Sequence, residues 1–246
     1  MNLRPPAIAA SFDAWMARRP LAYASLVVVA ACLVLGLFVD LPLLVHLQSE
    51  SWRAVKPAFR LLGQLGRAEG WIVGASVLYV VALLSAWRHG DGAVAAWYRW
   101  IARHCLLYFA ALIASGAAIH LLKNGIARLR PRQFLEEGGY GLGMPFDGHP
   151  WDSFPSGHTQ LAFATAAVLS LLAPRWAPAV YLLAGLVGFS RLVTGWHFLS
   201  DVVASAFIAV ISVQLLARPL LDSARAWPGL SPLAWWRHWW RLWRRR

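Results

Sequence analysis

The segment PLAYASLVVVAACLVLGLFV, residues 20–39, decides the fold because it contains no charged side chain. An α-helix needs about 20 mostly apolar residues to cross the hydrocarbon core of a bilayer. The segment is longer than the apolar core of a secretory signal peptide, which has roughly 7–15 residues. The sequence therefore predicts a membrane-spanning helix here rather than a cleaved leader.

The composition of the whole chain points the same way. Hydrophobic residues make up 59% and charged residues 14% of the 246 residues. Soluble domains have roughly 45–50% apolar and about 25% charged residues, so a soluble globule is excluded. The two cysteines, Cys32 and Cys105, show neither metal-binding nor redox spacing, which argues against a disulfide framework or a zinc site.

Five further apolar segments follow the first one. They comprise residues 71–87, 104–122, 157–173, 179–198 and 199–217. Arg191 and Asp201 interrupt the last two, where a bilayer makes ionisable groups costly unless they serve a purpose. We predict an all-α integral membrane bundle of six transmembrane helices, with residues 1–246 forming a single membrane-embedded domain.

The distribution of charge predicts how the bundle is oriented. The net charge of +12 is by itself compatible with nucleic acid, anionic lipid or a phosphorylated substrate as partner. Six spans place both termini on one side, and most of the 23 Lys and Arg residues lie there. Cytoplasmic loops are enriched in these residues. We expect a bacterial inner-membrane protein with cytoplasmic termini, a lipid partner and no nucleic-acid partner.

The C-terminal tail, residues 218–246, has an amphipathic pattern. Tryptophans at helical spacing form one stripe with arginines beside it: Trp235, Trp236, Trp239, Trp240 and Trp243. Such a helix lies in the membrane interface, and its positive charge favours anionic lipid headgroups. The tail is predicted to anchor the protein at the cytoplasmic surface.

The first of three polar clusters follows the third apolar segment. Lys123 and Arg130 are seven residues apart, so a continuous helix would place both on the same face. Two converging cations suit a phosphate group, Arg through its bidentate fork and Lys as a point charge. The alternative is that both residues anchor a helix end at the interface.

The second cluster, Ser156, Gly157 and His158, opens the fourth apolar segment. A helix start leaves backbone amides unpaired and is a natural anion site. Gly157 allows an oxygen to approach the backbone, Ser156 can donate a hydrogen bond, and His158 can deliver a proton near neutral pH. A Ser helix cap beside an incidental histidine is the alternative.

The third cluster combines Ser190, Arg191, His197 and Asp201. On a helix, residues four apart are neighbours, so the Asp201 carboxylate would accept from one imidazole nitrogen and leave the other free to attack. A purely structural His–Asp pair is the alternative. Because the spans alternate in direction, all three clusters fall on the same face of the membrane.

The remaining polar residues receive interpretations without chemistry. Arg128 and Arg132 are interpreted as solvated, the alternative being that they widen the cationic field, and the loop from 133 to 154 is expected either to cover the site or to select headgroups. Interfacial placement accounts for four residues at or near predicted helix ends: Asp40, His46, His104 and His120.

Together the motifs resemble the type 2 phosphatidic acid phosphatase superfamily. The matching residues are Lys123-x6-Arg130-Pro131, Pro155-Ser156-Gly157-His158 and Ser190-Arg191-x5-His197-x3-Asp201. The resemblance implies that His197 attacks phosphorus to give a phosphohistidine, that Asp201 activates it, and that His158 protonates the leaving group. It also implies no metal or other cofactor, and a phosphate-binding set of Lys123, Arg130, Ser156, Gly157 and Arg191.

The implied function is hydrolysis of a lipid phosphate at the periplasmic side. Candidate substrates are undecaprenyl pyrophosphate, phosphatidylglycerol phosphate, phosphatidic acid and lipid A. A phosphotransferase using a polyprenyl pyrophosphate donor and a non-catalytic lipid-phosphate carrier remain as alternatives. The related vanadium-dependent haloperoxidases are soluble, so the six predicted spans argue against that activity. The sequence leaves the oligomeric state open.

Overall fold

A computed structural model describes residues 20–221 of the chain. Packing assigns residues 32–221 to one compact unit and residues 20–31, which are helical, to another. The predicted interfacial helix of the C-terminal tail lies outside the described residues.

The regular secondary structure of residues 20–221 is helical, which confirms the all-α prediction. The longer helices are α2 (Pro20–Val34), α5 (Ala68–Arg88), α6 (Ala93–Ile126), α8 (Gly157–Leu172), α9 (Ala177–Val193) and α10 (Leu199–Leu220). A π-helical turn (Leu35–Val39) joins α2 to α3 (Asp40–Gln48), and a 3-10 turn (Gln64–Gly66) joins α4 (Lys56–Gly63) to α5. The short helix α7 (Pro131–Glu137) and two further 3-10 turns (Glu50–Trp52 and Pro174–Trp176) complete the set.

Five helical stretches in the described residues are long and apolar enough to cross a membrane. They are Pro20–Gln48, Lys56–Arg88, Ala93–Ile126, Pro174–Val193 and Leu199–Ala217. The segment predicted at 157–173 forms α8, which has 16 residues and is shorter than these five. The chain is therefore a multi-pass membrane protein.

One predicted segment has the wrong end. The sequence extended the fifth span through residue 198, but α9 stops at Val193. The chain then turns at Gly195, whose φ of +70° is a conformation that glycine adopts without steric cost. The helix ends at this turn, so residues 194–198 continue as a loop at the end of the bundle where the three polar clusters lie.

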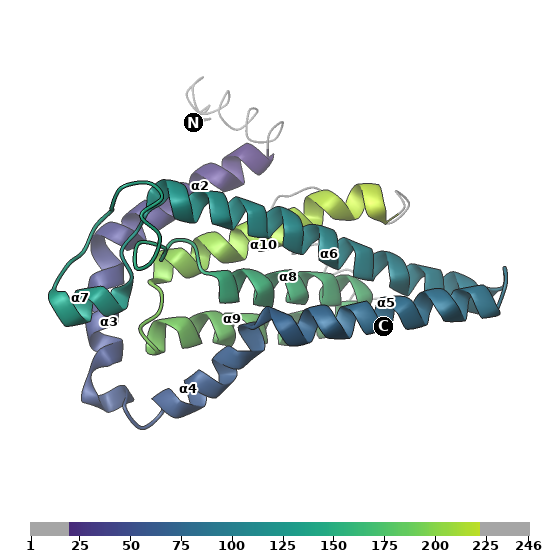
Figure 1. The fold of residues 1–246 in the computed structure, drawn as a ribbon, viewed down its shortest axis with the longest axis horizontal. Coiled ribbons are helices and arrows are strands. Elements are labelled where there is room, and N and C mark those ends of the chain that lie inside the picture. The colour runs from purple at the N-terminus through teal and green to yellow at the C-terminus, as the bar shows by residue number, and fades with distance from the viewer. Residues whose placement is uncertain (1–19, 222–246) are drawn as a thin grey trace, which may run out of the picture. The chain divides into compact units, whose positions relative to one another are not determined.

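Helix α8 is the centre of the larger unit. It packs against α6, α9 and α10, and Figure 1 shows it running between α9 and α10. Small buried residues allow the close approach, among them Ala164 and Ala167 on α8 and Ala209 on α10. At Gly188 of α9, an added Cβ would lie 2.9 Å from Val202. Membrane helices pack closely through such small residues.

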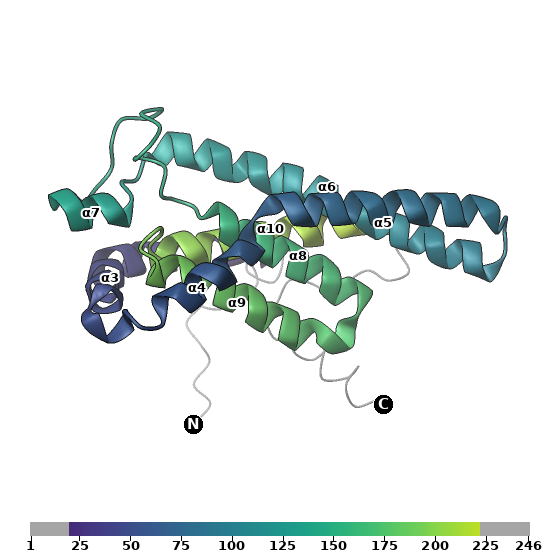
Figure 2. The ribbon, with the colours of Figure 1, turned by 60° about the horizontal axis from the view of Figure 1, so that its bottom comes forward.

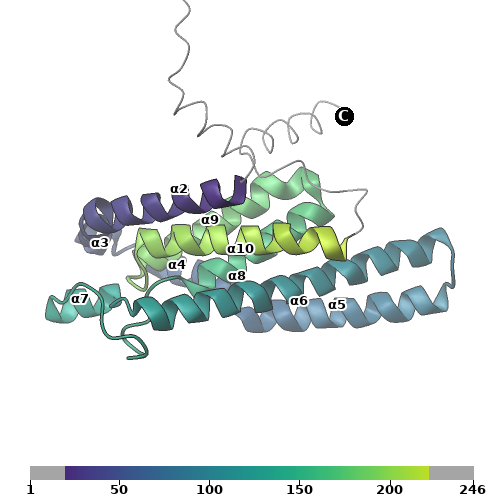
Figure 3. The same ribbon diagram turned by 90° about the horizontal axis from the view of Figure 1, so that it is seen from above.

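Two other features complete this unit. Helices α5 and α6 run side by side as an antiparallel pair, which Figure 3 shows from above. Helix α4 packs against α9, and Figure 2 shows α4 leading directly into α5. The loop with α7 lies at the same end as α3 (Figures 1 and 2).

Glycines let the α4–α5 junction approach α8 and α9. A Cβ at Gly63 would lie 3.1 Å from Ser190 Oγ and 3.3 Å from Arg191 Nη1. A Cβ at Gly66 would lie 2.9 Å from His158 Cβ and 3.0 Å from Val187 Cγ1. The junction therefore contacts two residues of the predicted site directly.

We predict that Gly66→Ala destabilises the protein. The clashing atoms lie next to the backbones of α8 and α9 and cannot swing away, and overpacking of this kind costs about 1–3 kcal/mol. Thermal unfolding in detergent should show a lower midpoint. Gly70→Ala is the matched control, because its added Cβ would meet nothing within 4 Å and alanine favours a helix. Equal midpoints for the two variants would contradict the packing argument.

Candidate active site

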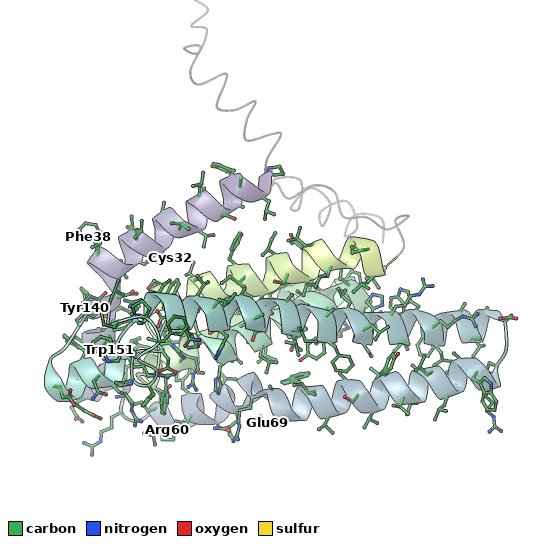
Figure 4. All side chains as sticks on the ribbon, turned by 45° about the horizontal axis from the view of Figure 1, so that its top comes forward. Cys32, Phe38, Arg60, Glu69, Tyr140 and Trp151 are labelled. Atoms are coloured by element: carbon green, nitrogen blue, oxygen red, sulfur yellow. The ribbon has the colours of Figure 1, made fainter. Side chains whose placement is uncertain are left out.

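The three polar clusters meet at one end of the bundle. Six of the predicted residues line one cavity of about 700 Å³: Lys123, Arg130, Gly157, His158, Arg191 and His197. They come from the C-terminal ends of α6 and α9, the N-terminal end of α8, and the segments that precede α7 and α10. Figure 4 labels Tyr140 and Trp151 at this end of the molecule.

The other two predicted residues are buried behind the cavity lining. Ser156 and Asp201 are each 0% exposed. The Ser156 hydroxyl accepts a hydrogen bond from Thr159 Oγ1 at 3.0 Å, and the Ser156 N–H donates to the Asp201 carbonyl at 3.2 Å. Ser156 thus joins the start of α8 to the start of α10, and its place as a phosphate ligand stays a prediction.

The predicted helical face shared by Lys123 and Arg130 is wrong. Helix α6 ends at Ile126, and Ala127 takes a left-handed conformation with φ of 47°. Arg130 has an extended backbone and precedes Pro131, which opens α7. The residue before a proline is pushed out of helical conformation, so no helix continues through this position. A loop, rather than helical periodicity, brings the two cations to one cavity.

Asp152 holds these two cations in place. Arg130 donates from Nε and Nη2 to the two carboxylate oxygens of Asp152 at 2.6 and 2.7 Å. Lys123 Nζ donates to the backbone carbonyl of the same residue. The hydrogen bonds from Arg130 hold the pKa of Asp152 well below its ordinary value. The sequence placed Asp152 in a loop that covers the site or selects headgroups, and this interpretation missed its pairing with Arg130.

The predicted helical spacing of His197 and Asp201 is also wrong in detail, because His197 precedes α10. Its Nδ1 lies 2.8 Å from the Ser153 carbonyl oxygen and 3.4 Å from Asp201 Oδ2. A carbonyl oxygen only accepts, so Nδ1 carries the proton and Nε2 has a free lone pair. The orienting effect expected from Asp201 is shared with a backbone carbonyl from the loop before α8.

Asp201 is itself held by several donors. Its Oδ2 accepts from Ser153 Oγ at 2.6 Å and from the Phe198 N–H at 2.9 Å. Its Oδ1 accepts from Arg128 Nη1 at 2.7 Å. A buried carboxylate is tolerated when it is paired and hydrogen-bonded in this way. The carboxylate therefore has a fixed position beside the imidazole of His197.

The interpretations of Arg128 as solvated and Asp40 as interfacial are wrong. Both are buried, and Arg128 Nη2 donates to Asp40 Oδ2 at 2.9 Å. Burial acts to lower the pKa of Arg128, but the Asp201 and Asp40 carboxylates outweigh it and raise that pKa above its ordinary value. The sequence signal for this ion pair was Asp40 itself, an acidic residue directly after a long apolar run, since ionisable groups in membranes are costly and usually paired.

The predictions for the other histidines and for Arg132 have different outcomes. His46 and His120 are exposed, as interfacial placement requires, whereas His104 is 3% exposed and its interfacial interpretation is wrong. His104 Nδ1 lies 2.8 Å from the Trp100 carbonyl oxygen. Arg132 is exposed, as the solvated interpretation expects, and its guanidinium carbon also lies 4.4 Å from the centroid of the Trp196 ring.

Trp196 and Arg191 complete the cavity wall. The guanidinium carbons of Arg130 and Arg191 each lie 5.7 Å from the Trp196 ring centroid, within reach of a cation–π attraction. In the part of the chain that the structure describes, Arg191 Nε is buried without a hydrogen-bond partner. A buried donor without a partner is costly, so its position beside the cavity points to an anionic ligand.

The cavity gives His197 the protonation state that a nucleophile needs. Burial lowers the pKa of His197 to about 4, so the imidazole is neutral at neutral pH and Nε2 keeps its lone pair. Within residues 20–221, no three His, Cys, Asp or Glu side chains are grouped to hold a metal ion. Lys123, Arg130 and Arg191 line the same cavity as His197 and supply positive charge there.

Known proteins are similar to this chain in sequence and in fold. The model of the PAP2 superfamily matches residues 104–222. A lipid A 1-phosphatase of Rhizobium etli is 34% identical over 163 residues, covering 63% of this chain and 67% of that protein. A lipid A 1-phosphatase of Rhizobium johnstonii is 35% identical over 131 residues, about half of each protein. The crystal structure of Aquifex aeolicus LpxE has a similar fold, with a TM-score of 0.51 and 23% identity over 72% of this chain and 93% of that chain.

The fold and the site define a multi-pass membrane protein with a cationic cavity around a neutral histidine. With the matches above, this chain belongs to the PAP2 superfamily. The membership agrees with the resemblance predicted from the three motifs.

The low pKa of His197 makes a prediction for the dependence of catalysis on pH. The group is neutral above its pKa of about 4 and loses its nucleophilic lone pair below it. We expect the acidic limb of kcat/KM for a phosphate ester, corrected for ionisation of the substrate, to lie at about pH 4 with a tenfold fall per pH unit below it, since this ratio reports the free enzyme. An acidic limb near 6.5, the ordinary histidine value, would contradict a buried neutral nucleophile.

Proposed function

We propose that this chain, a membrane-bound lipid phosphatase of the PAP2 superfamily, removes the 1-phosphate of lipid A through a phosphohistidine intermediate. The observation that carries the proposal is the free Nε2 of His197 in a cavity lined by three cations. The two Rhizobium relatives, named lipid A 1-phosphatases, support the choice among the candidate lipid phosphates.

Binding of the phosphate follows from the cavity lining. Lys123, Arg130 and Arg191 would neutralise its charge, and Arg191 Nε would gain the partner it lacks in the described structure. The free amides at the start of α8, at Gly157, would donate to a phosphate oxygen in the way helix N-termini bind anions. The loose transition state of phosphoryl transfer spreads charge over these oxygens, so fixed cations stabilise it.

The chemical steps use the two histidines in turn. The Nε2 lone pair of His197 attacks phosphorus, and the bond from phosphorus to the lipid oxygen breaks with its electron pair on that oxygen. His158 gives this oxygen a proton. Asp201 and the Ser153 carbonyl stabilise the positive imidazole. A water then attacks phosphorus and gives a proton to His158, the bond from phosphorus to Nε2 breaks with its electron pair on Nε2, and inorganic phosphate leaves.

We further propose that α8 is a sixth span and that the site faces the periplasm. A helix of 16 residues measures about 24 Å at 1.5 Å per residue, short of the roughly 30 Å core. Helices α6, α9 and α10 surround α8, so protein rather than lipid covers much of its surface. Six spans then leave both termini on the cytoplasmic side, where the tail would bind anionic headgroups, with residues 1–246 acting as one phosphatase domain.

A phosphate-release assay tests the proposed reaction. Purified protein in detergent should release inorganic phosphate fastest from lipid A, compared with undecaprenyl pyrophosphate, phosphatidylglycerol phosphate and phosphatidic acid. His197→Ala should retain no more than a few per cent of the rate because it removes the attacking atom. His89→Ala is the matched control, since His89 is exposed and follows α5 at the end remote from the site.

Other outcomes distinguish the alternatives. Phosphate recovered on an acceptor lipid instead of in solution would indicate a phosphotransferase. Tight lipid binding without release would indicate a carrier. A rate of His197→Ala equal to that of the wild type would remove histidine from the nucleophile position. Quenching in alkaline detergent with labelled substrate should trap an alkali-stable, acid-labile phosphoprotein in the wild type and none in the variant.

Inhibition provides an independent prediction. Vanadate should inhibit as a mimic of the pentacoordinate transition state, because such mimics bind more tightly than the substrate. Excess EDTA should leave the rate unchanged, since fixed cations supply the charge that a metal supplies in other phosphatases. A loss of activity in EDTA that added Mg²⁺ restores would show that a metal takes part.

A further inference from the structure

A row of three charged groups extends from His197 into the interior of the protein. Arg128 stands between two carboxylates, donating to Asp201 Oδ1 at 2.7 Å through Nη1 and to Asp40 Oδ2 at 2.9 Å through Nη2. Asp40 is 2%, Arg128 8% and Asp201 0% exposed. Asp40 and Asp201 are far apart in the sequence, and only the fold brings them to the same guanidinium.

The Asp40 carboxylate, like that of Asp201, accepts several hydrogen bonds. Asp40 accepts from the Ser200 N–H at 3.1 Å and from the Ser200 hydroxyl. The Ser200 hydroxyl also accepts from Arg128 Nη1 at 2.6 Å. Asp40 therefore contacts the first turn of α10, next to Asp201 itself.

Aromatic rings enclose the guanidinium. The Arg128 guanidinium carbon lies 4.1 Å from the Phe198 ring centroid. The Tyr140 hydroxyl accepts from Arg128 Nη2 at 2.9 Å and donates to the Gly36 carbonyl in the π-helical turn before Asp40 at 2.8 Å. These contacts help to hold the Arg128 guanidinium between the two carboxylates.

The balance of charge suggests what Asp40 does for the reaction. Asp201 and Arg128 alone would form a neutral pair, which offers little to a positive imidazole. With Asp40 the cluster holds two carboxylates and one guanidinium, a formal charge of −1. Electrostatic interactions are strong in a buried, weakly screened site, so this charge matters where His197 becomes positive.

We propose that Asp40 is a positioning residue for phosphoryl transfer: it binds the far side of Arg128, so that Asp201 keeps negative charge for the imidazolium of His197. The inference rests on the proposed function, because it requires His197 to become positive when it bonds to phosphorus. Asp40 itself touches neither the substrate nor His197, and its effect passes through Arg128 and Asp201.

The test is Asp40→Asn, which keeps the size and one acceptor oxygen but removes the charge. In the phosphate-release assay we expect kcat to fall about tenfold, the rate equivalent of one pKa unit, with KM unchanged. Asp91→Asn is the matched control, because Asp91 lies in the loop between α5 and α6, is fully exposed and pairs at 3.7 Å with Arg99 of α6.

Binding of two inorganic ions separates this role from a structural one. Vanadate mimics the state in which His197 is bonded and positive, whereas inorganic phosphate mimics the ground state. Asp40→Asn should weaken vanadate binding about tenfold and leave phosphate binding unchanged, matching the change in kcat. A structural anchor would instead lower both affinities together with the thermal unfolding midpoint.

A second variant keeps the test valid if Asp40→Asn unfolds. Arg128→Lys retains the charge, but a single ammonium lacks the planar fork that spans two carboxylates. It should show the same selective loss of vanadate binding. Unchanged vanadate binding and kcat in a folded Asp40→Asn protein would overturn the inference. A wild-type protein that binds vanadate and phosphate but releases no phosphate from any lipid would instead overturn the proposed function.

Discussion

The fixed position of the Asp201 carboxylate is the constraint on which the active-site end of this molecule depends. A charge buried within a membrane protein must be paired and hydrogen-bonded, and removing one partner of a buried pair costs about 3–5 kcal/mol. Asp201 meets this requirement with donors from three parts of the chain: Arg128, Ser153 and Phe198. The same contacts draw the loop after α6, the loop before α8 and the start of α10 together, so satisfying one carboxylate builds the site.

The cations that line the cavity also need partners that offset their charge. Asp152 pairs with Arg130 through both carboxylate oxygens, and Trp196 faces the guanidinium groups of Arg130 and Arg191. These contacts hold like charges close together against their mutual repulsion. The site is therefore preorganised, and a bound phosphate needs to reorganise little of it, which is the main source of electrostatic catalysis.

Local sequence rules located the polar residues but misjudged the backbone that carries them. Periodicity placed Lys123 with Arg130, and His197 with Asp201, on helices, yet α6 ends at Ile126 and α10 begins at Leu199. A proline and a glycine near these points, Pro131 and Gly195, were the local signals of both breaks. The cations nevertheless reach one cavity, because the motif spacings suit the loops of this fold as well as helical turns.

By itself, the sequence determined the membrane class, the all-α fold and six of the residues that line the cavity, because long apolar runs and the ionisable groups that interrupt them can be read locally. Only the tertiary structure decided which partners these groups have. Asp40 and Arg128 looked incidental in the sequence, since nothing local shows that residues 88 positions apart form a buried ion pair. Pairing across the bundle depends on how α3, α6 and α10 pack, and helix packing is set by the shapes of side chains that meet only in the folded protein.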